Sequence, residues 1–314
     1  MADIIDTLRS RFKMASLLAR IIYVNVGVFV VLRIIGLVGF LFGFNADSII
    51  SYVELPSSPA MFIVQPWSII TYMFAHYDIF HILFNMLCLW WMGQLFLQFF
   101  SPRHLTGLYF VGGIGGGLLY MLAYNLFPAF SAHTGMLLGA SASIMAIVVA
   151  AAVYAPNYKV MLLFFGSISL KWIAIAIIFI DLISISGGNA GGHISHIGGA
   201  AVGLLFVLLL RRGVDITRWM NAIIDFLVNS YNRMFSRSGG GGGAPRIRIN
   251  PTYRKRGRNR SQAAPEPTRR SGTGMSAEDE RIMDEILKKI KVSGYSALTD
   301  EEKERLFSVS RKKN

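Results

Sequence analysis

Long apolar stretches separated by short polar breaks dominate the first two thirds of the chain. Backbone polar groups in lipid must be satisfied internally, so apolar runs of this length are typical of membrane helices. The pattern therefore predicts an all-α, polytopic membrane protein with six membrane-spanning helices. The six spans are expected at about residues 21–44, 79–100, 105–127, 139–154, 171–185 and 193–210.

Two further apolar segments are not expected to cross the membrane. Residues 45–78 are rich in apolar and aromatic side chains such as Trp67, but they also contain several prolines. Residues 160–170 form an apolar patch that is too short to span and is interrupted by Gly166. We expect both segments to lie at the membrane interface.

Positive charge marks alternate ends of the predicted spans. Arg103, Lys159 and the pair Arg211-Arg212 would lie on one side, and the connections 45–78, 128–138 and 186–192 on the other side contain no Lys or Arg. Cytoplasmic loops carry the excess of Lys and Arg in most membrane proteins. This asymmetry predicts that both ends of the chain are cytoplasmic.

Composition divides the chain into five parts. Residues 236–274 contain five consecutive glycines and many basic residues, which cannot bury a core and predict a disordered linker. Beyond it, Thr299 and Glu302 have the spacing of a capping box, so a small helical hairpin is expected. The predicted parts are a basic cytosolic segment 1–20, a membrane domain 21–211, an amphipathic juxtamembrane segment 212–235, the linker 236–274 and a helical cytosolic module 275–314.

The formal net charge of +13 does not alter the prediction of a membrane protein. Its Lys and Arg residues cluster at the ends of apolar segments and in the tail, which favours anionic lipid head groups rather than nucleic acid as the partner. A single cysteine, Cys88, excludes an intrachain disulfide framework.

Four polar residues fall at one predicted depth, near the outer ends of three spans that run in the same direction. They are His81, Asn85, Ser141 and His196. Polar side chains inside a bilayer are expensive and indicate a functional site. Singly, each has a structural explanation, such as a hydrogen bond within its own helix. Together they favour acyl transfer, with Ser141 as nucleophile and His196 as base.

Small residues allow the helices carrying these groups to approach. Ala142, Ala146 and Ala150 form a stripe on one span, and Gly199 with Gly203 forms a small-xxx-small pair on another. His81, Asn85 and the backbone N–H of Ser141 could then stabilise an oxyanion. Asp181 is expected to lie too deep or on the wrong face to orient the base, so a Ser-His dyad is predicted.

Neither a metal nor a cofactor is predicted. His193 could compete with His196 as base, whereas His76 and His133 are expected to be loop residues. None of these histidines has a carboxylate or thiol beside it in the sequence, which disfavours a metal site.

With these motifs in place, the chain resembles the rhomboid family of intramembrane serine proteases over about residues 20–211. The resemblance lies in the family's H-x-x-x-N, G-x-S-G and H-x-x-G-x-x-x-G motifs, matched here by His81 to Asn85, Gly139 to Ala142 and His196 to Gly203. It implies a six-helix bundle, a Ser141/His196 dyad, an oxyanion site at His81 and Asn85, and cleavage of transmembrane substrates near their outer ends.

The sequence departs from the family pattern at three positions. Ala142 replaces a glycine, Ser68 follows Trp67 where many members carry arginine, and Met145 stands where some members have a tyrosine. No reacting group is lost, so the sequence predicts an intramembrane serine endopeptidase. Two alternatives are an inactive rhomboid-like protein that binds transmembrane helices, and a small transporter with a histidine proton path. The compact spacing of the spans favours a bacterial inner membrane.

Overall fold

The computed structural model describes residues 6–7, 10–12, 14–130, 134–162, 166–236, 285–286, 299 and 301–302. The chain divides into two units, Met1–Gly242 and Gly243–Asn314, and the first contains the whole membrane domain. Six main helices form this domain, in the order that the apolar pattern predicts: α2 (Leu17–Phe42), α6 (Ile79–Phe96), α7 (Pro102–Leu126), α8 (Ser141–Tyr154), α9 (Leu170–Ser184) and α10 (Ala190–Leu210). The protein is therefore all-α and polytopic, as predicted.

The helices differ in their ability to cross a membrane. In the described part of the chain α2, α6, α7 and α10 are long and apolar enough to do so. The 14 residues of α8 and the 15 of α9 make helices about 21–22 Å long, shorter than the roughly 30 Å hydrocarbon core. A helix of this length does not reach across the whole hydrocarbon core by itself.

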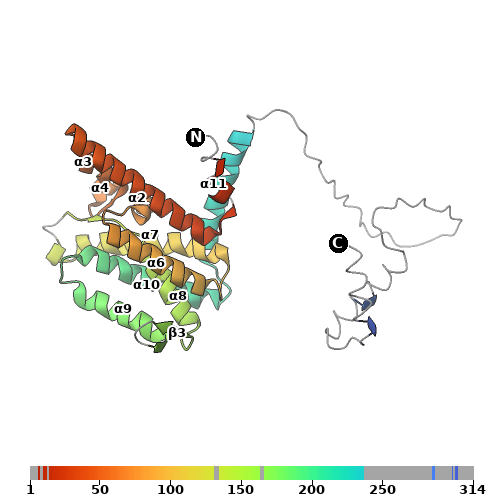
Figure 1. Ribbon diagram of the computed structural model, residues 1–314. Helices are drawn as coiled ribbons and strands as arrows, with labels where there is room; N and C mark the ends of the chain where they lie inside the picture. The colour runs from red at the N-terminus through yellow and green to blue at the C-terminus, as the bar shows by residue number, and fades with distance from the viewer. Residues whose placement is uncertain are drawn as a thin grey trace, which may run out of the picture. The chain divides into compact units, whose positions relative to one another are not determined.

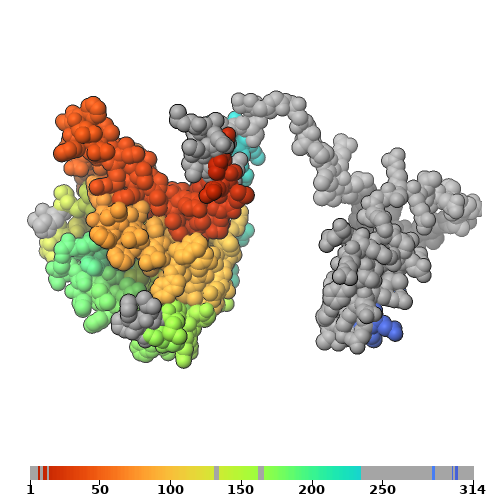
Figure 2. Space-filling model, in the orientation of Figure 1, coloured from red at the N-terminus to blue at the C-terminus, as the bar shows by residue number. Residues whose placement is uncertain are grey.

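Helix ends follow local capping chemistry. Ser16 accepts a hydrogen bond from the Ala19 amide and begins α2, and Ser101 caps α7 with Pro102 at its first position. Asp78 caps α6 through its carboxylate, which accepts from the amides of Phe80 and His81. The C-terminal half of α2 extends away from helices α6 to α10 (Figures 1 and 2).

The connection between α2 and α6 folds onto the bundle. It contains α3 (Ala46–Ile50), η1 (Ser51–Val53), β1 (Leu55–Pro56), α4 (Pro59–Val64), α5 (Ser68–Thr71) and η2 (Tyr72–Phe74). Tyr72 is buried, and its hydroxyl donates to the Gly113 carbonyl of α7 over 2.6 Å. The Tyr72 carbonyl in turn accepts from the Gly139 amide. This segment therefore packs against the residues that precede α8.

Two short strand pairs were not predicted. β1 pairs antiparallel with β2 (Met136–Leu137), and β3 (Lys159–Leu162) pairs with β4 (Gly166–Ser169) in an antiparallel hairpin. The second pair occupies the apolar patch between α8 and α9. The first is important for the site because it fixes the residues just before Gly139. A short 3-10 turn, η3 (Pro128–Phe130), follows α7.

Helices α7, α8 and α10 pack tightly in the centre of the bundle. A Cβ added to Gly199 would overlap the Ala142 carbonyl, and one added to Gly203 would overlap the Ala146 carbonyl. A Cβ added to Gly116 of α7 would lie 2.6 Å from the Ala142 side chain, so α7 also packs closely against α8. The small residues that predicted close helix packing therefore make backbone contacts here.

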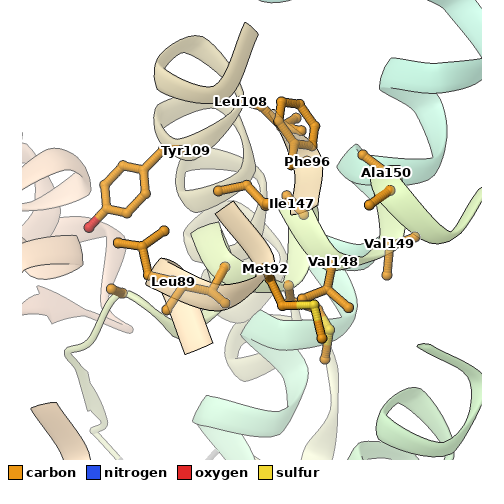
Figure 3. Packing of buried hydrophobic residues seen from close by; sticks show 14 of the residues in the cluster. Leu89, Met92, Phe96, Leu108, Tyr109, Ile147, Val148, Val149 and Ala150 are labelled. Carbon is orange, nitrogen blue, oxygen red and sulfur yellow. The ribbon is translucent and has the colours of Figure 1, made fainter. Parts of the chain in front are cut away.

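The half of the bundle away from Ser141 is filled with apolar side chains. Leu89, Met92 and Phe96 of α6 meet Leu108 and Tyr109 of α7 and the segment Ile147 to Ala150 of α8 (Figure 3). These side chains are almost fully buried. A polar path through the membrane, which the transporter hypothesis requires, has no support in this packing.

Basic residues gather at the opposite end from Ser141, as the charge pattern predicts. Arg211 donates to the Val153 carbonyl near the end of α8, and Arg103 forms an ion pair with Asp225 at 2.8 Å. Asp225 lies on α11 (Arg218–Ser236), the predicted amphipathic juxtamembrane segment, which packs against α7.

The predicted C-terminal module lies mostly outside the described residues, as do residues 237–274 of the predicted linker 236–274. Its capping box is described: the Thr299 amide donates to the Glu302 carboxylate over 2.8 Å, and the Glu302 amide donates to the Thr299 hydroxyl. This local prediction is confirmed.

The central packing gives a first prediction. Gly199→Ala would force α8 and α10 apart, so we expect the free energy of unfolding to fall by about 1–3 kcal/mol. Gly27→Ala on α2 is the matched control, because nothing lies within 4 Å of its added Cβ. Unfolding in detergent micelles measures both variants. Equal stability of the two would contradict the close contact.

Candidate functional site

The structure brings the four predicted site residues to one end of the bundle. Ser141 is the first residue of α8, and His81 lies in the first turn of α6. α10 begins at Ala190, three residues earlier than predicted, so His196 lies in its second turn. Because α6, α8 and α10 run in the same direction, their first turns meet at the same level.

These residues line one cavity of about 830 Å³. Ser141, His196, His81 and Asn85 all line it, together with apolar side chains from α6 and α9. No direct hydrogen bond joins Ser141 to His196 within the described ranges of the chain. Catalytic contacts are often long before substrate binds, so the shared cavity is the relevant observation.

The residues before α8 shape the cavity wall at Ser141. Gly139 has φ of +118°, which favours glycine, and a Cβ there would lie 3.0 Å from Nε2 of His81 and 3.9 Å from Oγ of Ser141. The His81 imidazole and the Ser141 hydroxyl thus both lie close to Gly139. The first intrahelical bond of α8 comes from the Ile144 amide, leaving the amides at the helix start free to face a negative charge.

The expectation for Asp181 is wrong. Its carboxylate on α9 lies 2.9 Å from Nδ1 of His196 and 2.8 Å from Nδ1 of His193, and its side chain is only 5% exposed. An ionised carboxylate accepts hydrogen bonds, so both rings donate Nδ1–H to the same Oδ1. His196 consequently keeps the lone pair of Nε2 for another group.

The same three residues bear on the expectation that no metal binds, because they bring a carboxylate beside two histidines. Asp181, His193 and His196 each offer one ligand atom, and these atoms lie within 4.8 Å of one another. The carboxylate that the sequence lacked beside the histidines is supplied by a different helix. The second carboxylate oxygen, Oδ2 of Asp181, is buried without a hydrogen-bond partner in the described part of the structure.

His76 is a loop residue, as expected, but it is buried beside the site. Its Nε2 accepts from the Ala140 amide at 3.4 Å, and its ring meets the His81 ring edge-on at 5.0 Å between centroids. Burial, and then the charge of His81, lower the pKa of His76 to about 4, and the Phe74 carbonyl opposes this shift. No sequence pattern predicted this position, because His76 lies in a connection between helices. His133 lies outside the described residues.

The remaining predicted positions have simple local structure. Asn85 donates to the His81 carbonyl in its own helix over 3.0 Å and also lines the cavity. Met145 lines the cavity one turn after Ser141. Ser68 is buried, whereas Trp67 is half exposed and donates from its ring nitrogen to the Tyr52 carbonyl.

Comparison with known proteins gives a family match for this part of the chain. The family model described as "Rhomboid domain" matches residues 64–213. The matched region includes all residues that line the cavity, residues 64–78 before α6 and the helices from α6 to α10.

Two curated relatives are similar over the same part of the chain. RHOMBOID-like protein 12, mitochondrial, from Arabidopsis thaliana is 31% identical over 157 residues, covering 46% of this chain and 47% of the relative. Presenilin-associated rhomboid-like protein A, mitochondrial, from Danio rerio is 28% identical over 174 residues, covering 54% of this chain and 44% of the relative. The chain thus spans a little under half of each relative.

Both relatives are described as mitochondrial, so the bacterial inner membrane expected for this chain stays a prediction.

The burial of His76 predicts a pH effect on stability. Its folded pKa of about 4 lies below the ordinary histidine pKa of 6.5, so its contribution to the free energy of unfolding is complete above pH 6.5 and is lost as the pH falls toward 4. Between pH 7 and pH 5, we expect the wild type to lose about 2 kcal/mol more unfolding free energy than His76→Gln. Unfolding titrations in detergent at both pH values measure this difference. Equal losses in the two proteins would show that His76 is not buried in its neutral form.

Proposed function

The chain is a member of the rhomboid family, and from this premise we propose that it is an intramembrane serine endopeptidase. The observation that carries the proposal is the shared cavity of Ser141 and His196, with a carboxylate held against the far nitrogen of the histidine. These groups come from three helices, α8, α9 and α10. A serine, a base and an orienting group are the parts that acyl transfer requires.

In the proposed reaction, Ser141 Oγ attacks the carbonyl carbon of a peptide bond, and His196 Nε2 takes the hydroxyl proton. The tetrahedral intermediate collapses to an ester of Ser141, and the leaving amine receives the proton from His196. Water then attacks the ester, with His196 again taking and returning a proton. The products are a free carboxylate and a free amine, and Ser141 is regenerated.

Asp181 supports His196 in this scheme as a positioning residue. With Nδ1–H donated to Asp181 at 2.9 Å, the ring has its lone pair on Nε2, which is the form that can accept a proton from serine. The carboxylate also stabilises the imidazolium that forms in the reaction. We therefore propose an assembly of Ser141, His196 and Asp181 in place of the dyad expected from the sequence.

The start of α8 supplies donors for the developing oxyanion. The backbone N–H of Ser141 lies in the first turn, where amides lack intrahelical acceptors and the helix dipole favours negative charge. The imidazole of His81 lies beside Gly139, and the Asn85 amide lines the same cavity. We assign all three groups to oxyanion stabilisation.

The substrates we propose are membrane proteins cleaved in or near a transmembrane segment. The cavity is lined by Phe80 and Phe84 of α6 and by Ile177 of α9, so an apolar segment could enter between these helices. Because α8 is short, its first residue Ser141 would lie below the outer surface. We further propose a bacterial inner membrane with both termini cytoplasmic, and contact of the basic tail with anionic lipid head groups.

The proposal predicts the effect of removing either reacting group. Ser141→Ala and His196→Ala should each lower cleavage of a single-span model substrate in liposomes by about 10³-fold or more, with unchanged thermal unfolding. Ser143→Ala is the matched control, since its hydroxyl is buried away from the cavity. If Ser141→Ala cleaves as well as the wild type, the protease assignment is wrong. A wild type that binds but cleaves no substrate in a broad panel would instead support the helix-binding alternative.

A second prediction concerns Asp181. Asp181→Asn keeps the side-chain shape but removes the charge that fixes the His196 ring, so kcat should fall at least about tenfold with little change in KM. Asp225→Asn, which removes an exposed carboxylate at the opposite end of the bundle, is the control. The two variants are compared in the same liposome assay after thermal unfolding has shown that both are as stable as the wild type. Unchanged kcat in Asp181→Asn would exclude the positioning role.

A further inference from the structure

We propose that Asp181, His193 and His196 form a site for a divalent cation of the zinc type, and that the bound ion switches the protease off. Two imidazoles and one carboxylate are a common protein ligand set for Zn²⁺, with a fourth position open to water. The ligand atoms lie within 4.8 Å of one another, and the cavity beside Asp181 and His196 gives an ion access. The inhibitory part of this inference rests on the proposed function, but the binding part does not.

The hydrogen bonds of the cluster leave it incomplete without a further group. Both Nδ1 atoms point at the same oxygen, Oδ1 of Asp181, at 2.8 and 2.9 Å. Oδ2 of Asp181 is buried and has no partner in the described parts of the chain. Buried polar atoms are normally satisfied, so an unpaired carboxylate oxygen beside two imidazoles favours a further, electron-accepting partner such as a metal ion.

The distances are close to those of a coordinated ion. Ligand atoms about 2.0–2.1 Å from a tetrahedral Zn²⁺ lie about 3.3 Å apart. The two His-Asp contacts, at 2.8 and 2.9 Å, would therefore lengthen by about half an ångström, and the two imidazole nitrogens, which lie within 4.8 Å of each other, would move together around the ion by rotation of their side chains. The histidine side chains are 21–22% exposed, so they are not locked in a closed core.

The consequence for catalysis follows from the tautomer of His196. An ion at Nδ1 takes the lone pair of that nitrogen, so the single proton of the neutral ring must move to Nε2. Nε2–H can only donate, and the ring can no longer accept the proton of Ser141. Each histidine keeps one proton in this exchange, and no oxidant or further reactant is needed. A bound ion thus inhibits the enzyme without occupying the nucleophile.

Binding is tested first, independently of activity. Zinc chloride is titrated by calorimetry into the detergent-purified full chain carrying Ser141→Ala. We expect one ion per chain, and at least about tenfold weaker binding when His193→Gln is added. The matched control adds His104→Gln instead, because His104 faces Asp215 at the opposite end of the bundle. Asp181→Asn is the second ligand variant, in case His193→Gln alters folding.

Inhibition is tested in the liposome cleavage assay, with each variant compared with its own zinc-free rate. Zinc should inhibit the wild type and the His104→Gln variant, a chelator should restore cleavage, and His193→Gln should need at least about tenfold more zinc. Unchanged zinc binding in His193→Gln, or an equal loss in His104→Gln, overturns the site. Binding at the site without inhibition overturns the switch. Failure of the wild type to cleave any substrate would refute the proposed function. The ion site would then still be tested by the calorimetric titration alone.

Discussion

The contact between the backbones of α8 and α10 is the constraint on which the site depends. Gly199 and Gly203 allow α10 to touch the carbonyls of Ala142 and Ala146, and no larger side chain fits there. Ser141 lies one residue before the first of these contacts, and His196 lies one turn before Gly199. The sequence spacing of the small residues, which lets α8 and α10 pack closely, therefore also brings Ser141 and His196 to one cavity.

A membrane interior makes unpaired polar groups expensive, and the structure meets this cost by pairing most of them. Asp181 accepts from two imidazoles, and buried Asn25 shares hydrogen bonds with Tyr109. His76 satisfies both ring nitrogens through the Phe74 carbonyl and the Ala140 amide. Of the buried side-chain atoms without a hydrogen-bond partner in the described part of the chain, those of Ser68, His104 and Ser143 lie away from the cavity. Oδ2 of Asp181 is also unpaired, and Asp181 lines the cavity beside the proposed ion site.

The sequence predicted the helical spans well, because long apolar runs and the Lys and Arg asymmetry are strong signals. It also predicted that Ser141 and His196 would lie at one level, since three spans run in the same direction, and both residues line the same cavity. It failed for Asp181, because apolar periodicity does not fix how α9 is rotated and tilted against α10. The strand pairs were missed for a related reason. Two to four residues carry no clear alternation, and long-range pairing such as Leu55 with Leu137 leaves no local pattern.

The central claim is that Ser141 is an activated nucleophile, and covalent labelling tests it without knowledge of the substrate. The full chain in detergent is treated with a fluorophosphonate, which reacts with activated serines, and the adduct is located by mass spectrometry. The account predicts labelling of Ser141 in the wild type, none at the buried neighbour Ser143, and loss of the label in His196→Ala. A folded wild type with no adduct at Ser141, or equal labelling in His196→Ala, would contradict it.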